Sequence, residues 1–466
     1  MKRTFLLTWM VAIATLMQVQ SEIKLPAIFA DHMVIQRDAS TKMWGKADAN
    51  KRVTVVTSWN LKRYTTTSDA NGNWQLDITT PRAGGPHTIV ISDGKPMTLS
   101  NVMSGEVWLC SGQSNMEMPM KGFNSQPVEG SAMDILKSAN SKIRLFTVAR
   151  NHSLTPVDDV KGTWQEAAPI SVRDFSATGY YFGRLLNEIL DIPVGLINSS
   201  WGGSRIETWM NEEMLAGFPR TVIHRETENV KQPHQKPLYC YNAMIHPLTG
   251  FAIRGAIWYQ GESNRNNSEE YAELFGAMVK GWRTKFNNPN MPVYYCQIAP
   301  FEYKDGRNSA YLREAQLKAT TIVENTGMAV LMDAGERVNI HPAKKKEAGE
   351  RLALLALSKT YAMPGISGES PVYKSMKISN DTVTITFDNA PVGVAAPDFQ
   401  SQLFTVAGED RVFYPARTRI TGSKITVISD QVKEPKAVRY AFENYLIGDL
   451  KGADGLPVSS FRTDNW

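Results

Sequence analysis

The chain has 466 residues, of which 42% are hydrophobic and 21% are charged, and these are ordinary proportions for a globular protein. They exclude the disordered and fibrous classes, and the length allows two or three domains with separate cores. The formal net charge is only +5, and the longest basic run, Lys344–Lys346, lies in a helical pattern, so nucleic acid is not expected as a partner.

Residues 1–21 have the pattern of a secretory signal peptide. Lys2 and Arg3 precede an apolar run from Phe5 to Met17, and a plausible cleavage site follows at Ser21. The apolar run is too short to span a membrane as a helix. We therefore expect an exported protein, periplasmic or secreted, with no membrane anchor after cleavage.

Residues 22–103 are expected to form an N-terminal β-sandwich domain. Short runs of alternating and β-branched residues are separated there by turns rich in Gly, Asn and Pro. The predicted strands are Thr41–Trp44, Arg52–Trp59, Trp74–Ile78 and His87–Ser92. A packing or spacer role is favoured for this domain, with carbohydrate binding as the alternative.

Between residues 104 and 365 the pattern changes to alternating strands and helices. The predicted strands are Val107–Leu109, Ile143–Val148, Val194–Asn198, Ile253–Tyr259, Val293–Ile298 and Ala329–Met332. The predicted helices are Ala177–Ile189, Glu207–Met214, Glu269–Trp282, Ala310–Val323 and Lys345–Thr360. This alternation predicts an α/β domain in which helices cover both faces of a parallel sheet.

After Pro364 the chain becomes rich in predicted strands again. These are Thr382–Phe387, Leu403–Val406, Lys424–Ile428 and Val438–Phe442, and they predict a small β subdomain over 366–445. The tail, 446–466, is apolar enough that we expect it to pack back on the core. The three cysteines, Cys110, Cys240 and Cys296, allow at most one disulfide, and buried free thiols are favoured over metal ligands.

A polar turn carrying Ser114 follows the predicted strand Val107–Leu109. In open α/β sheets, reactive groups lie beyond the carboxyl ends of the strands. Ser114 is therefore a candidate nucleophile, although a plain turn serine is the alternative on this stretch alone.

Two further polar turns follow predicted strands in the same way. In Asn198–Ser204, the Gly202-Gly203 pair allows backbone N–H groups to approach a ligand closely, as an oxyanion hole requires. In Gln260–Asn264, the amide of Gln260 or Asn264 could donate to a developing oxyanion, and the carboxylate of Glu262 could orient a histidine. A flexible loop and a helix-capping turn are the plainer readings of these two stretches.

His341 is the best candidate for a general base among the seven histidines. It follows the last predicted strand of the α/β domain and precedes the closing helix. This is the chain order of serine and histidine expected when both lie on loops at one edge of a sheet.

Four blocks of the sequence together resemble those of the SGNH/GDSL hydrolases, specifically the sialate O-acetylesterase branch and its carbohydrate acetylesterase relatives. The blocks are Gly112–Met116, Trp201–Gly203, Trp258–Asn264 and Ile340–Pro342. The resemblance covers nearly the whole mature chain. It implies a flavodoxin-like three-layer core, no metal or other cofactor, and removal of O-acetyl groups from sugars.

The resemblance also implies roles for single residues. Ser114 matches the nucleophile and His341 the base, which together would form an acetyl-enzyme intermediate. Gly202 and Gln260 would join the Ser114 backbone N–H in the oxyanion hole, with Asn264 as a further member.

The chain departs from the family pattern at the acidic member of the triad. Many relatives have an aspartate two or three residues before the histidine, where this chain has Asn339 and Val338. Glu262 is then the best candidate for the third member. Asp333 and Glu336 are the alternatives, as is a Ser-His dyad with a backbone carbonyl partner.

Three residues beside these turns are candidates for substrate contact. Trp201 and Tyr259 offer aromatic faces for a sugar ring, and Arg205 could bind a carboxylate such as that of a sialic or uronic acid. Core packing and an ion pair with Glu207 are the competing interpretations. The prediction is thus an exported esterase for O-acetylated sugars, sialate first, with xylan or another plant glycan as the alternative substrate. A non-catalytic glycan-binding protein is the alternative from another class.

Overall fold

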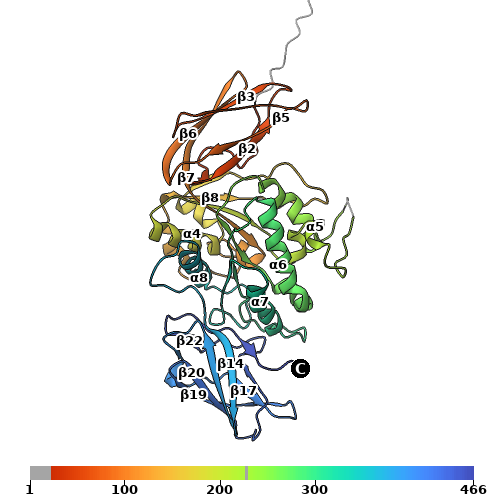
Figure 1. Cartoon of the computed structure of the whole chain (residues 1–466), viewed down its shortest axis with the longest axis vertical. Helices are drawn as coiled ribbons and strands as arrows, with labels where there is room; N and C mark the ends of the chain where they lie inside the picture. Colours follow the sequence, from red (N-terminus) through yellow and green to blue (C-terminus); the bar gives the residue numbers. More distant parts are fainter. Residues whose placement is uncertain (1–22, 226–228) are drawn as a thin grey trace, which may run out of the picture.

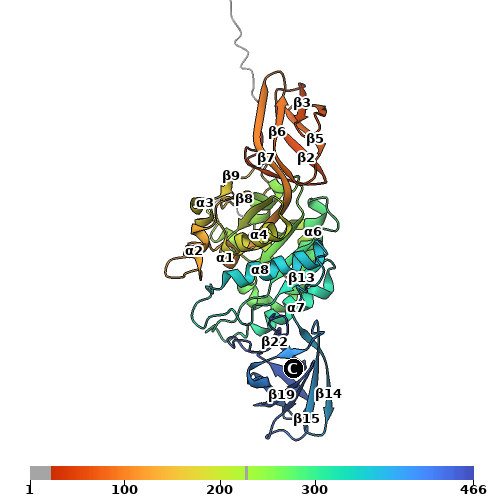
Figure 2. The same ribbon diagram turned by 90° about the vertical axis from the view of Figure 1, so that its left-hand side faces the viewer.

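The computed structural model describes residues 23–225 and 229–466, so the predicted signal peptide lies outside the described residues. The described chain is elongated, with β-strands at each end and a mixed α/β part between them (Figures 1 and 2). This agrees with the predicted α/β class, while the boundaries at 103, 365 and 445 remain predictions. No helix in the two described ranges is both long enough and apolar enough to cross a membrane.

The central part contains a sheet with the strand order β13-β12-β11-β7-β10-β8-β9, in which all neighbours are parallel except β8 and β9. The bounds are β7 Pro96–Gly112, β8 Asn140–Thr147, β9 Trp164–Ala167, β10 Val194–Ser200, β11 Gly255–Tyr259, β12 Val293–Cys296 and β13 Thr326–Ala329. Every residue of β10 and of β11 is buried, as is typical of parallel strands covered on both faces.

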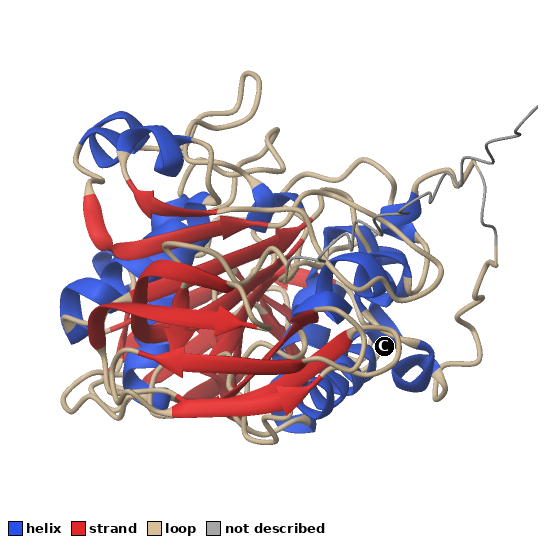
Figure 3. Cartoon of the chain, turned by 90° about the horizontal axis from the view of Figure 1, so that it is seen from above, coloured by secondary structure: helices blue, strands red, loops and turns tan. Residues whose placement is uncertain are grey.

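Two apolar clusters cover the two faces of this sheet. Along β7, Trp108 and Cys110 belong to one cluster, and the alternate residues Val107 and Leu109 belong to the other. The first cluster contains helices α4 (Ala177–Leu190) and α8 (Lys345–Leu355), and the second contains α6 (Ser268–Lys285) and α7 (Ala310–Ile322). Seen from above, helices flank the strands (Figure 3).

Shorter helices occupy the connections. They are α1 (Ser114–Glu117), α2 (Ser131–Leu136), α3 (Pro169–Arg173) and α5 (Glu212–Leu215). The helix predicted over Glu207–Met214 is wrong, because a 3-10 helix Ile206–Trp209 ends at the extended Met210 and α5 then begins after the Asn211 cap. The last predicted strand begins three residues too late, since β13 is Thr326–Ala329, and the closing helix continues past Leu355 as a π-helix Ala356–Thr360.

The N-terminal strands form two antiparallel sets, apart from the first strand, which pairs parallel with β7. They are β1 (Val34–Gln36), β2 (Ser40–Lys46), β3 (Arg52–Thr57), β4 (Arg63–Thr67), β5 (Asn73–Thr79) and β6 (Gly84–Ser92). Strand β2 pairs with β5, whereas β3 pairs with β4 and β6, and β6 pairs with the first part of β7. Because the second part of β7 lies in the parallel sheet, one continuous strand joins the two regions.

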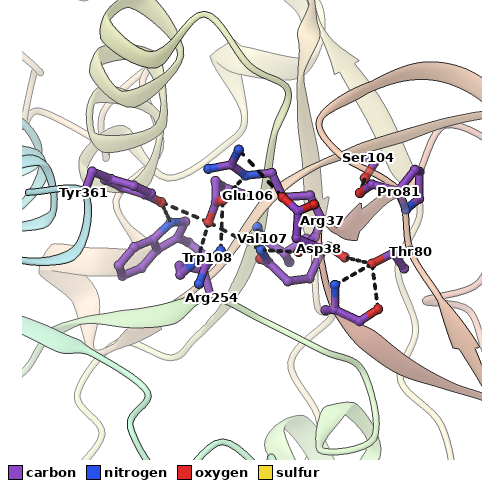
Figure 4. Close-up of polar contacts among 12 residues, drawn as sticks. Arg37, Asp38, Thr80, Pro81, Ser104, Glu106, Val107, Trp108, Arg254 and Tyr361 are labelled. Atoms are coloured by element: carbon purple, nitrogen blue, oxygen red, sulfur yellow. Dashed lines mark hydrogen bonds and ion pairs between the residues drawn. The ribbon is translucent and has the colours of Figure 1, made fainter.

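A buried carboxylate lies where β7 passes from one region into the other (Figure 4). Glu106 has a fully buried side chain and accepts hydrogen bonds from Arg37, Arg254 and the hydroxyl of Tyr361. Burial alone would raise the pKa of Glu106, but the two guanidinium groups outweigh it and hold the pKa below its ordinary value.

The C-terminal strands form small antiparallel sheets. They are β14 (Val372–Ser379), β15 (Thr382–Asp388), β16 (Val394–Ala395), β17 (Phe404–Ala407), β18 (Phe413–Pro415), β19 (Arg417–Thr421), β20 (Lys424–Ile428), β21 (Ala437–Tyr440), β22 (Lys451–Gly452) and β23 (Phe461–Arg462). The tail returns to the rest of the chain, since β23 pairs with β21 and Arg462 forms an ion pair with Glu314 of α7. Cys110, Cys240 and Cys296 are all buried free thiols.

Candidate active site

Ser114 lies directly beyond the end of β7, at the start of α1. The turn before it depends on Gly112, which has φ +136° and whose Cβ, if it had one, would lie 2.2 Å from the backbone oxygen of Tyr259. The next residue, Gln113, donates its N–H to the same oxygen at 2.9 Å. Asn115 and Met116 are buried, whereas Ser114 is half-buried.

The Gly202 loop lies against Ser114. The Trp201 N–H donates to the backbone oxygen of Gly112 at 3.1 Å, and a Cβ on Gly202 would lie 3.3 Å from Ser114 Cβ. The N–H of Gly202 itself donates to Glu117 Oε2 at 2.8 Å, and the other carboxylate oxygen of Glu117 accepts from Arg150 Nε at 2.6 Å. The expected oxyanion donor is therefore beside Ser114, but a carboxylate holds it in this structure.

His341 lies in the loop before α8, next to the residue that contacts the Ser114 loop. The two loops are joined by Asn115, whose Nδ2 donates to the backbone oxygen of Ile340 at 3.1 Å. The described part of the chain contains no direct hydrogen bond between Ser114 Oγ and His341, and such bonds are often long before substrate binds. Burial, together with the positive charge of Lys345, lowers the pKa of His341 to about 4, so the imidazole is neutral near pH 7, which is the form that a general base needs.

The Nδ1 atom of His341 lies 2.7 Å from Oε1 of Gln126, a residue that the sequence did not single out. Within the described ranges, none of the three predicted acids forms a hydrogen bond or an ion pair with the ring. Glu262 Oε1 accepts from Asn115 Nδ2 at 2.6 Å, and its Oε2 is buried without a partner. Burial raises the pKa of Glu262.

The two alternative acids are held elsewhere. Asp333 accepts two hydrogen bonds from Arg351, at 2.7 and 2.9 Å, and pairs with Lys451. Glu336 accepts the N–H of Ala343 at 2.6 Å and a weaker bond from Asn339.

Gln260 and Asn264 are fully buried and bond to one another. Gln260 Nε2 donates to Asn264 Oδ1 at 2.7 Å and to the backbone oxygen of Ser204 at 3.1 Å, so both of its amide hydrogens are already bonded. Asn264 Nδ2 donates to Glu207 at 2.9 Å, and its Oδ1 accepts the N–H of Ile206. These amides brace the loop that carries Gly202, and the structure does not direct them at Ser114 as the sequence predicted.

The three residues expected to contact substrate differ in their environment. Tyr259 is fully buried with an unpartnered hydroxyl and belongs to the core. Arg205 forms an ion pair with Glu207 at 3.0 Å, as the competing interpretation held. Trp201 is half-buried and stacks on His234 with ring centroids 5.4 Å apart, while Arg150 lies over its ring at 5.7 Å.

Sequence reasoning missed Gln126, Glu117, Arg150 and Lys345. The last of these is a buried lysine whose Nζ donates to Asn115 Oδ1 at 2.8 Å, and burial lowers its pKa to about 7. In the sequence Lys345 is the middle residue of a run of three lysines, a pattern that predicts an exposed helix face. No group of His, Cys, Asp and Glu side chains in 23–225 and 229–466 is placed to hold a metal ion.

The fold is shared with a solved carbohydrate acetylesterase from Xanthomonas citri. The two structures superpose with a TM-score of 0.87 at 33% identity, over 96% of this chain and 100% of that one. The mixed α/β chain with its polar loops at the strand ends is thus a carbohydrate esterase.

The match to a family model is more specific. The model described as carbohydrate esterase, sialic acid-specific acetylesterase, matches residues 104–358, and the chain belongs to this family. A sialate O-acetylesterase of Rattus norvegicus is 28% identical over 89% of this chain and 88% of its own length. The sialate O-acetylesterase of Homo sapiens is also 28% identical, over 74% of this chain and 72% of its own length.

Proposed function

We propose that this carbohydrate esterase is exported and removes O-acetyl groups from sugars through an acetyl-enzyme intermediate on Ser114. The observation that carries the proposal is the meeting of three loops, in which half-buried Ser114 lies against Gly202 and Asn115 ties it to the His341 loop. We also propose that the parallel sheet and its two helical faces are the flavodoxin-like SGNH core that the sequence motifs imply.

The chemistry needs one proton carrier. Neutral His341 accepts the Ser114 proton as Oγ attacks the ester carbonyl, and the protonated ring then returns that proton to the departing sugar oxygen. Water adds to the acetyl-enzyme with the same histidine as base, which releases acetate and restores the serine. The low pKa of His341 keeps the base available even at mildly acidic pH.

The tetrahedral intermediate needs hydrogen-bond donors for its oxyanion. Ser114 begins α1, where the first N–H groups of a helix have no partner inside it, and the Gly202 N–H is adjacent. Each such donor is worth about 3 kcal/mol in measured enzymes. For Gly202 to serve, the carboxylate of Glu117 has to move away when the substrate enters.

We propose an O-acetylated sialic acid as the first substrate to test. The curated relatives named sialate O-acetylesterase match most of the chain, which supports this choice. Arg150 supports it independently, because its side chain is 54% exposed and lies beside Trp201, where it could bind the substrate carboxylate once Glu117 moves. Acetylated xylan lacks that carboxylate on its main chain and is the alternative.

Acetate release tests the proposal directly. Wild type, Ser114→Ala and His341→Ala are compared on 4-nitrophenyl acetate, on a 9-O-acetylated sialic acid and on acetylated xylan. We expect wild-type turnover, a loss of about 10³-fold or more in both variants, and a preference for the sialic acid. A wild-type protein that binds glycans but releases no acetate would refute the esterase proposal and favour a glycan-binding protein. N-terminal sequencing of the exported chain tests cleavage after residue 21.

A further inference from the structure

The ring of His341 has an unusual partner for a catalytic histidine. Its Nδ1 lies 2.7 Å from the amide oxygen of Gln126, and within residues 23–225 and 229–466 no carboxylate forms a hydrogen bond or ion pair with the ring. In serine hydrolases this nitrogen usually donates to a buried acid, which holds the tautomer whose other nitrogen faces the serine. Here an amide oxygen occupies the place of that acid.

The candidate acids are not free to take this place. Asp333 is fixed by a two-pronged bond to Arg351, and Glu336 is bonded to the backbone of Ala343. Glu262 is bonded to Asn115, so it supports Ser114 from the side of the serine loop. Asn339, which stands where many relatives have an aspartate, accepts the backbone N–H of His341 at 3.0 Å and leaves the ring alone.

The loop that carries Gln126 is held firmly in position. Phe123 and Gln126 exchange backbone hydrogen bonds at 3.0 and 3.1 Å across a tight turn. Gly122, with φ +80°, has no room for a side chain, because a Cβ would lie 2.3 Å from the Gln126 backbone oxygen. The Met120 N–H donates to the backbone of Phe175, and this anchors the loop next to α4.

The same loop contacts the imidazole a second time. The ring of Phe123 meets that of His341 edge-on, with centroids 5.2 Å apart and planes at 72°. One short turn therefore supplies both an apolar wall and a polar acceptor for the histidine. Such double contact is what fixing a ring in one orientation requires.

We propose that Gln126 is the positioning residue of His341, its amide oxygen accepting Nδ1–H so that Nε2 presents its lone pair to Ser114. The inference rests on the proposed function of Ser114 and His341. The partner is neutral, so it selects the tautomer without adding negative charge beside the imidazolium that forms during the reaction. The charge that acts on the ring is instead the positive one of Lys345, while Glu262 and Glu336 are bonded to other groups.

The test compares Gln126→Met, which keeps the length and removes the acceptor, with Gln126→Glu, which replaces the amide with a carboxylate. Asn124→Ala, an exposed change in the same loop, is the matched control. We expect Gln126→Met to lower kcat about 10- to 100-fold with KM nearly unchanged, since a positioning hydrogen bond is lost but no substrate contact is. Gln126→Glu should retain activity and move the acid limb of kcat/KM to higher pH, because a carboxylate stabilises the imidazolium.

A tautomer measurement makes the test independent of turnover. In protein labelled with ¹⁵N-histidine, the His341 signal, assigned by its loss in His341→Ala, should report Nδ1–H in wild type and a mixture of tautomers in Gln126→Met. A Gln126→Met enzyme with wild-type kcat, pH profile and tautomer would overturn the inference while leaving the esterase intact. An inactive wild type whose His341 is nevertheless Nδ1–H would refute the proposed function alone.

Discussion

Neutralising Glu106 should destabilise the chain far more than neutralising an exposed glutamate. The Glu106 side chain is 0% exposed, whereas its partners Arg37 and Arg254 are 27% and 35% exposed. In Glu106→Gln both guanidinium groups lose the buried carboxylate that they share, and among the described residues only Arg37 keeps a second, exposed partner, Asp38 at 3.9 Å. Breaking a buried ion pair from one side costs roughly 3–5 kcal/mol, and because both arginines keep some access to water we expect about 3 kcal/mol.

Urea unfolding followed by far-UV circular dichroism measures this difference. The control is Glu213→Gln, because Glu213 is 70% exposed in its pair with Lys285 and should cost less than about 1 kcal/mol. Midpoints of Glu106→Gln and Glu213→Gln that coincide would refute the reasoning.

The effect of Glu106 should also depend on pH. Its pKa in the folded chain lies below the ordinary value of 4.5, so its contribution is complete above that value and is lost as the pH falls through the lowered folded pKa. The difference in unfolding free energy between wild type and Glu106→Gln should therefore be largest at neutral pH and decrease only in acid. A gap that stays constant down to pH 3 would show that packing, rather than charge, sets the cost.

Three further changes test the site. Gly112→Ala forces a Cβ into the backbone of β11 at a φ of +136°, so we expect a loss of several kcal/mol in unfolding free energy and of most esterase activity. Glu117→Ala frees the N–H of Gly202, and kcat/KM on 4-nitrophenyl acetate should rise by up to about 10-fold; a fall would show that this carboxylate assists the reaction. Burial is the larger cause of the lowered His341 pKa, and Lys345→Met removes only the smaller one, the positive charge. The acid limb of kcat/KM should therefore move to higher pH than in wild type, and an unmoved limb would exclude that electrostatic coupling.

The elements buried on both faces could be predicted from the sequence. Strand β11 and the first four residues of β10, Val194–Ile197, are apolar runs whose signal needs no tertiary context. The strand over Arg63–Thr67 was missed because its residues are charged or polar and alternate between exposed and half-buried. The prediction of one helix over Glu207–Met214 was wrong because the side chain of Asn211 caps a new helix in the middle of this amphipathic stretch.

The loops of the site were predictable, but the partners within them were not. Ser114, Gly202 and His341 follow from where strands end in the chain. The hydrogen bond between His341 and Gln126 joins residues 215 positions apart, so no local sequence pattern predicts it. In the sequence, Gln260 and Asn264 are amides directly after a strand and are therefore candidates for an oxyanion hole. The structure shows that they are hydrogen-bonded to each other.

The long strand β7 makes the region that carries Ser114 hard to separate from the β-strands before it. The strand pairs with β6 near Pro96 and ends at Gly112, so about 50 Å of extended backbone crosses the boundary without a linker. A chain shortened to begin at residue 104 would lose β1, expose an edge of the remaining sheet, and strip Arg37 from Glu106. An exchange of the N-terminal β-strands for another module would therefore have to leave β7 and its partner β1 intact.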